Sequence, residues 1–167
     1  MSACSELKDV IADLFAFLAN GGYRTVYEDE RGTDGCVVGL EGHSIRIKFY
    51  TARDERLNIL VGSGTALFDV GTGKDGDAGW YYIRGIAGYL DHDLSIGERF
   101  ASRSYKEWSG EQDDQESNLA RLLEGHIDGI ERIFAAGFEK ERSKYEQYIT
   151  AVDARTRSAY ESGPRKH

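Results

Sequence analysis

A glycine-rich run is the first stretch of this 167-residue chain that suggests chemistry. Residues 71–76, Gly-Thr-Gly-Lys-Asp-Gly, fit the letters G-x-G-x-x-G. A dinucleotide site needs such a run to lead from a parallel strand straight into a helix whose N-terminus binds the pyrophosphate. Here the run follows strands expected in hairpin order, Asp75 and Asp77 would repel a phosphate, and Asp75 stands where a Walker sequence needs a hydroxyl group. We interpret the run as an exposed loop rather than a nucleotide site.

Carboxylates gather at two places where a metal ion or a proton transfer is conceivable. The loop carboxylates from Asp69 to Asp77 lack the twelve-residue calcium pattern with its terminal glutamate, which favours a solvated loop. Glu124, Asp128 and Glu131 recur at i, i+4 and i+7, so they share one face of a helix and could serve acid–base or metal chemistry. The alternative, which we favour, is that this face is simply the wet side of the helix.

The histidines and cysteines show no catalytic spacing. His126 has no second histidine four residues on, which excludes the zinc-protease helix, and its place on an apolar stripe favours a core or edge histidine over a ligand. Cys4 and Cys36 form neither a C-x-x-C motif nor a disulfide framework, and Cys36 is typical of a small core residue on a strand. His43 and His92 are isolated. We therefore predict no enzymatic activity, no cofactor and no metal site; the alternative is an enzyme with an unrecognised site.

Charge and composition exclude several classes of partner. The chain has 21 Lys and Arg against 29 Asp and Glu, a net charge of −8, so nucleic acid and anionic membrane surfaces are disfavoured. The longest apolar stretch, 10–19, is interrupted by Asp13 and is too short to cross a bilayer. The first residues lack the basic and apolar regions of a signal peptide, so a cytoplasmic location is expected.

The elements that would position these residues follow from hydrophobic spacing. Apolar residues recur every three or four positions from Leu7 to Leu18, which predicts a helix over about 5–20 that begins at a Ser2 or Ser5 cap and ends at Asn20-Gly21-Gly22. Alternation is clearest at Ile45, Ile47 and Phe49 and indicates an antiparallel sheet with one buried and one wet face. The expected strands are 23–28, 36–40, 43–50, 57–61 and 65–70.

Helices are expected after the sheet. A short helix over 80–91 is predicted, although its first residues, 80–83, could begin as a strand. A long helix from about 117 carries an apolar stripe that continues more loosely past Gly137 to Ile149. The prediction is one α+β domain over 1–154, with an N-terminal helix, about five mainly antiparallel strands, a short helix and a long C-terminal helix on the sheet, followed by a polar, frayed tail over 155–167.

The connector between the two predicted helices carries the strongest functional signal. Residues 91–116 hold eight acidic residues against three basic ones, interleaved with aromatic side chains. Aromatic anchors inside a charged rim are a common construction of protein interfaces, and an acidic field speeds the capture of a basic partner. The alternative is that the rings pack the long helix onto the sheet. The predicted partner-binding residues are Tyr89, Asp91, Asp93, Glu98, Tyr105, Trp108, Glu111, Asp113, Asp114 and Glu116.

This layout resembles small bacterial immunity proteins that neutralise polymorphic or contact-dependent toxins. The similar features are the hairpin strands 45–50 and 57–62, the segment Trp80-Tyr81-Tyr82-Ile83-Arg84-Gly85-Ile86-Ala87-Gly88-Tyr89-Leu90, and the helix over 119–134. The resemblance implies stoichiometric binding of a cognate toxin, often a cationic nuclease, with no chemistry of its own, by a monomer or homodimer.

The first sixty residues also look like an acidic secretion chaperone. The opening helix is followed by Asp29-Glu30-Arg31-Gly32 and by Leu40-Glu41-Gly42, which lead into alternating strands. Chaperones of that kind place a dimerising helix after the third strand, whereas here 57–70 is expected to continue as β structure. The chaperone or adaptor function therefore stands as the alternative to the immunity function.

Overall fold

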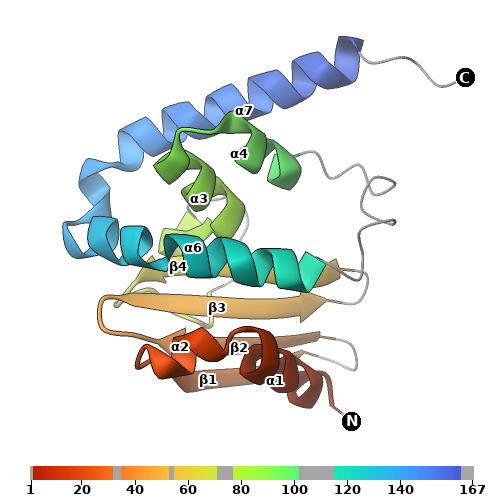
Figure 1. Cartoon of the computed structure of the whole chain (residues 1–167), viewed down its shortest axis with the longest axis vertical. Coiled ribbons are helices and arrows are strands. Elements are labelled where there is room, and N and C mark those ends of the chain that lie inside the picture. The colour runs from red at the N-terminus through yellow and green to blue at the C-terminus, as the bar shows by residue number, and fades with distance from the viewer. Residues whose placement is uncertain (1, 32–34, 53–54, 71–76, 102–114, 163–167) are drawn as a thin grey trace, which may run out of the picture.

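The computed structural model describes residues 2–31, 35–52, 55–70, 77–101 and 115–162, and shows a five-stranded antiparallel sheet with helices on one face (Figure 1). The strands lie side by side in chain order, β1-β2-β3-β4-β5, with short connections between the first four and a longer one from β4 to β5. This confirms the predicted α+β class. The strands are β1 Arg24–Arg31, β2 Gly35–Glu41, β3 Ile45–Ala52, β4 Glu55–Ser63 and β5 Trp80–Tyr82.

Alternation along the strands builds the main core. Ile45, Ile47 and Phe49 on β3 face the same side as Ile59 and Val61 on β4, and all five are buried. Helices α1, α3 and α6 close over this inner face (Figure 1). The helices are α1 Ala3–Leu14, α2 Ala16–Asn20, α3 Ile83–Asp91, α4 Leu94–Ala101, α6 Gln115–Ala135 and α7 Arg142–Ser162, with short 3-10 turns η1 Asp77–Gly79 and η3 Phe138–Lys140.

The N-terminal helix is divided in two. Ser2 caps α1 by accepting a hydrogen bond from the Ser5 amide, as one of the two predicted caps. The prediction of one helix to residue 20 is wrong at Phe15, which leaves helical geometry at φ −113° and ψ 28°. Its ring is buried edge-on against Phe49, with ring centroids 5.0 Å apart, so core packing overrides the helical pattern at this point. The stop at Gly21-Gly22 is confirmed, with Gly22 at a φ of +90°.

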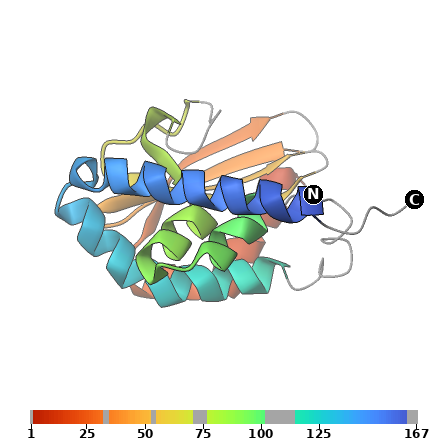
Figure 2. The same cartoon turned by 90° about the horizontal axis from the view of Figure 1, so that it is seen from above.

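The fifth strand was assigned to the wrong residues. The run 65–70 is not a strand; β5 is Trp80–Tyr82, which pairs with Leu60, Val61 and Gly62 of β4. Residues 64–70 instead fold back over the outer face of the sheet, away from α6 (Figure 2). The predicted helix over 80–91 is confirmed only from Ile83, after the strand that its first residues were able to form.

Two long helices complete the chain. A turn at Gly137, with a φ of +96°, separates α6 from α7, and α7 lies across α3 and α4 (Figure 2). Residues 155–162, expected within a frayed tail, are the last turns of α7. Tyr145 and Val152 are buried and attach this polar helix to the fold. The predicted loose continuation of the stripe to Ile149 is thus helical, but in a separate helix after the turn at Gly137.

Candidate partner-binding surfaces

Tyr89, predicted to bind a partner, joins α3 to the C-terminal helices. Its hydroxyl donates a hydrogen bond to the carboxylate of Glu141, and its ring meets Tyr145 and Tyr148 of α7 at right angles. Partial burial, with the bond to Glu141, raises the pKa of Tyr89 to about 12. The side chain is half-buried, so its main contacts are inside the fold.

Asp93 is exposed, and the structure gives it a role at the start of α4. Its Oδ1 accepts hydrogen bonds from the amide of Ser95 at 2.9 Å and from the Ser95 hydroxyl at 2.6 Å. Its carbonyl oxygen accepts the hydroxyl of Tyr148 at 2.8 Å. The side chain of Asp93 therefore caps the start of α4. Its carbonyl oxygen holds the α3–α4 corner against α7.

Asp91 links α3 to α6 through a histidine. Its Oδ2 lies 2.8 Å from Nε2 of His126, and Nδ1 of His126 lies 2.7 Å from the carbonyl oxygen of Leu122. Both partners are hydrogen-bond acceptors, so the two bonds exist together only when the imidazole carries a proton on each nitrogen. Asp91 remains exposed at the end of α3, and His126 lies at the edge of the core.

The other predicted residues are only partly placed. Glu116 lies half-buried in the first turn of α6, where a carboxylate is favoured by the helix dipole. Glu98 is on α4, but its side chain is outside what the structure describes. Tyr105, Trp108, Glu111, Asp113 and Asp114 lie outside the described residues.

Exposed carboxylates extend beyond this corner over the helical layer. Asp9 and Asp13 are one turn apart on α1, and Glu124 and Asp128 are one turn apart on α6, which packs against α1 (Figure 1). Together with Asp91 we call these residues the acidic face. The sequence predicts that Glu124 and Asp128 lie on the solvent-exposed side of their helix. No signal in the sequence indicates that this helix packs against α1.

Gly125 lies within the acidic face. A Cβ atom built on this glycine has no neighbour within 4 Å, so the fold does not require a small residue there. By contrast, a Cβ at Gly129 would lie 3.4 Å from Leu90, which places Gly129 where α3 approaches α6. A solvent-exposed glycine in a helix costs about 1 kcal/mol relative to alanine, and Gly125 brings no packing gain in return.

Glu131, the third carboxylate of this helix face, accepts a hydrogen bond from another part of the fold. It accepts a 2.8 Å hydrogen bond from the hydroxyl of Tyr23, whose burial, with this bond, raises the pKa of that phenol. Among the described residues no group of three or more His, Cys, Asp or Glu is placed to hold a metal ion.

The outer face of the sheet is the main feature that the sequence analysis missed. Residues 64–70, which we call the strap, are fixed by three side chains of the sheet that donate to strap carbonyls. Arg46 bonds Ala66 at 2.9 Å, Trp80 bonds Leu67 at 2.8 Å, and Lys48 bonds Val70 at 3.0 Å. The prediction of a wet outer face is therefore wrong for this region.

The strap covers a second apolar cluster. Leu60, Ala66, Phe68 and Trp80 are buried there, and Lys48 is only 4% exposed with its ammonium 4.5 Å from the centroid of the Trp80 ring. A cation over an indole face is favourable, more so when shielded from water. The strap thus serves the fold. Its signal in the sequence is that basic residues occupy every second position of β3 and face small residues on the neighbouring strands.

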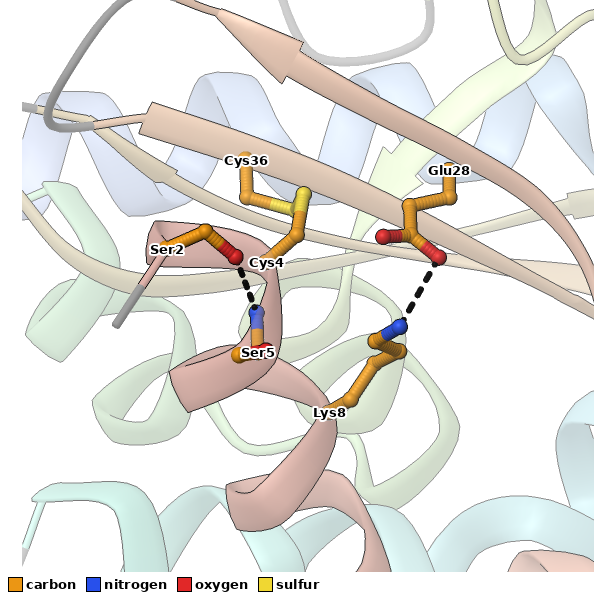
Figure 3. Close-up of a disulfide and its surroundings, with 6 residues drawn as sticks. All are labelled: Ser2, Cys4, Ser5, Lys8, Glu28 and Cys36. Atoms are coloured by element: carbon orange, nitrogen blue, oxygen red, sulfur yellow. Dashed lines mark hydrogen bonds and ion pairs between the residues drawn. A yellow bond between two sulfur atoms is a disulfide. The ribbon is translucent and has the colours of Figure 1, made fainter.

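A disulfide joins Cys4 of α1 to Cys36 of β2 (Figure 3). The expectation that these cysteines form no disulfide is wrong, whereas Cys36 lies in the core as predicted. The α1 spacing places Cys4 one turn before Leu7 on the buried face, and strand alternation places Cys36 on the same inner face as Val38. Combining the two periodicities was the signal that could have found the pair.

No family model, no curated protein and no solved structure matches the chain. Within the described residues no helix is long and apolar enough to span a membrane. Inferences about function therefore rest on the surfaces described above.

Proposed function

We propose that this chain is a non-catalytic binding protein whose acidic face captures a basic protein partner, in the manner expected of an immunity protein that neutralises a cationic toxin. The observation that carries the proposal is that α1, α3 and α6, which lie on one side of the sheet, all carry exposed carboxylates. An acidic surface of this kind attracts a basic partner and aligns it before close contact.

Two further features support a protein as the ligand. Gly125 leaves an open position among the carboxylates, where the backbone of a partner can approach α6 closely. The connector residues Glu111, Asp113 and Asp114 lie outside the described part, and in the sequence they add three negative charges shortly before α6. Trp108 of the connector is the aromatic anchor we propose for this interface.

The test compares two charge-reversal variants as bait in a pull-down from a lysate of the source organism. The face variant carries Asp9→Lys, Asp13→Lys, Glu124→Lys and Asp128→Lys. The control variant carries Glu146→Lys and Asp153→Lys, two exposed carboxylates of α7. We expect wild type and control to retain the same basic protein in a stoichiometric complex, and the face variant to lose it.

Each other result counts against the proposal. A basic partner retained equally by the face variant would place the binding surface elsewhere. Several acidic partners would favour the chaperone function. An activity of the isolated chain on a small molecule would overturn the non-catalytic assignment. The cytoplasmic location stays a prediction, and the disulfide bears on it because disulfides persist mainly in oxidising compartments.

A further inference from the structure

The C-terminal end of helix α1 is fixed in the core. We call this end the pivot and the rest of the helix the lever. The pivot is Phe15, which interrupts the helix and is buried against Phe49. Just after it, Leu18 of the short helix α2 is also buried in the core. The pivot end of α1 is thus held by large apolar side chains whose burial does not depend on the far end of the helix.

The far end of α1 is held mainly by the disulfide. Cys4, in the first turn, is 1% exposed and Cys36 is 0% exposed, so the bond lies inside the core (Figure 3). The other anchors of α1 are buried Leu7, the partly buried Ala3, Val10, Ile11 and Leu14, and an exposed ion pair between Lys8 and Glu28, 3.1 Å long. Exposed ion pairs contribute little, and a helix of twelve residues is marginal without tertiary contacts.

We propose that the Cys4–Cys36 disulfide is a redox latch that holds α1 against β2 and releases it about the Phe15 pivot when reduced. In the opening step the disulfide takes two electrons and two protons from a dithiol reductant, giving two cysteine thiols and the reductant's own disulfide. Closing is the reverse exchange, in which a protein or small-molecule disulfide is the oxidant. Because both sulfurs are buried, the reductant acts when the first turns of α1 open.

The latch is independent of the proposed partner, but it bears on the acidic face. Asp9 and Asp13 lie on the lever, so the latch sets their position relative to Glu124 and Asp128 on α6. If the partner-binding proposal fails, the motion of α1 is still measurable in the isolated chain.

The experiment is hydrogen exchange followed by mass spectrometry on the isolated chain, with and without a small dithiol. Closing a loop of 32 residues stabilises a whole fold by a factor of about 100 to 1,000, and this is the upper limit for its effect on the opening of α1 alone. We therefore expect reduction to speed exchange of α1 amides, residues 5–14, by up to that factor. Amides of β3 and β4 should change far less.

The matched control is the double variant Cys4→Ala, Cys36→Ala, which should show the fast α1 exchange with and without the dithiol. If this variant does not fold, the dithiol titration of the wild type decides alone. Equal loss of protection in α1 and in β3–β4 would show a global staple and overturn the latch. Unchanged α1 exchange, or two alkylatable thiols in the untreated protein, would also overturn it.

Discussion

Gly39 lies beneath the ring of Phe68, and a Cβ there would be 2.4 Å from a carbon of that ring. We expect Gly39→Ala to lower the free energy of unfolding by about 1–3 kcal/mol, because a buried ring and the strap that carries it must shift. The new methyl group of Gly125→Ala meets open space, so this substitution should raise the free energy of unfolding by about 0.5–1 kcal/mol.

Urea denaturation of both variants beside wild type measures the two effects. The two substitutions add the same methyl group. Opposite changes in the free energy of unfolding would therefore come from the different surroundings of the two glycines. A Gly39→Ala protein as stable as wild type would mean that the strap does not lie closely on the sheet.

The two bonded tyrosines predict how stability depends on alkaline pH. Tyr23 and Tyr89 have raised pKa values in the folded chain, about 12 for Tyr89, against about 10 for a free phenol. The folded state therefore holds its phenolic protons more tightly than the unfolded state. Both contributions are complete below about pH 10; that of Tyr89 is lost as the pH rises from about 10 to 12, while that of Tyr23 begins to fall over the same range.

The measurement is the unfolding midpoint in urea across that pH range for wild type and for the double variant Tyr23→Phe, Tyr89→Phe. Lysines titrate in both proteins, so the difference between the two curves reports the phenols. We expect the variant to lose stability less steeply as the pH rises. Parallel curves would contradict the assignment of these hydrogen bonds.

At the scale of elements, the strands that were predicted well are those with one buried face and close hairpins. Leu57, Ile59 and Val61 alternate because only one side of β4 meets the helices, and this period survives in the structure. The strap was taken for a strand because Ala66 and Phe68 also alternate. They alternate to cover a face, and one partner that decides this, Gly39 beneath Phe68, is distant in sequence.

The C-terminal helices rest on close contacts with two glycines. A Cβ at Gly88 of α3 would lie 2.0 Å from the Tyr148 hydroxyl of α7, and Gly97 of α4 lies under the same side chain. We expect Gly88→Ala to lower the free energy of unfolding by about 1–3 kcal/mol, because Tyr148 loses its bond to the Asp93 carbonyl.

A double-mutant cycle with Tyr148→Phe checks this contact. Removing the hydroxyl first takes away both the clash and the hydrogen bond, so Gly88→Ala should cost less in that background. Additive losses would show that the crossing of α3 and α7 does not depend on this contact.

At the scale of the molecule, charge is distributed unevenly. Helices α1, α3, α4 and α6 together carry nine acidic residues against five basic ones, whereas α7 carries three against four. For the proposed complex we expect the association rate constant to fall by about tenfold or more between low and physiological salt, with a smaller change in the dissociation rate. Stopped-flow mixing with the captured partner measures both, and a salt-independent association rate would contradict steering by the acidic face.

The candidate surface was only half visible in the sequence. The dense charge of 91–116 indicated the exposed acids Asp91 and Asp93, but these residues and Tyr89 also have structural contacts that local composition does not reveal. The carboxylates of α1 join the surface only through tertiary packing of α1 on α6. Such placement depends on contacts between residues more than a hundred positions apart, which spacing cannot encode.

The chain-order arrangement of the sheet also has a consequence for biosynthesis. The disulfide partners and strands β1 to β4 are all present once the first 63 residues have left the ribosome, and their pairings are between neighbours. Helix α6, which covers Ile47 and Phe49, begins only at Gln115. A nascent chain can thus form four strands of its sheet early. The part of the sheet that α6 covers stays exposed while some fifty further residues are synthesised. During this interval the exposed apolar surface is available to a ribosome-associated chaperone.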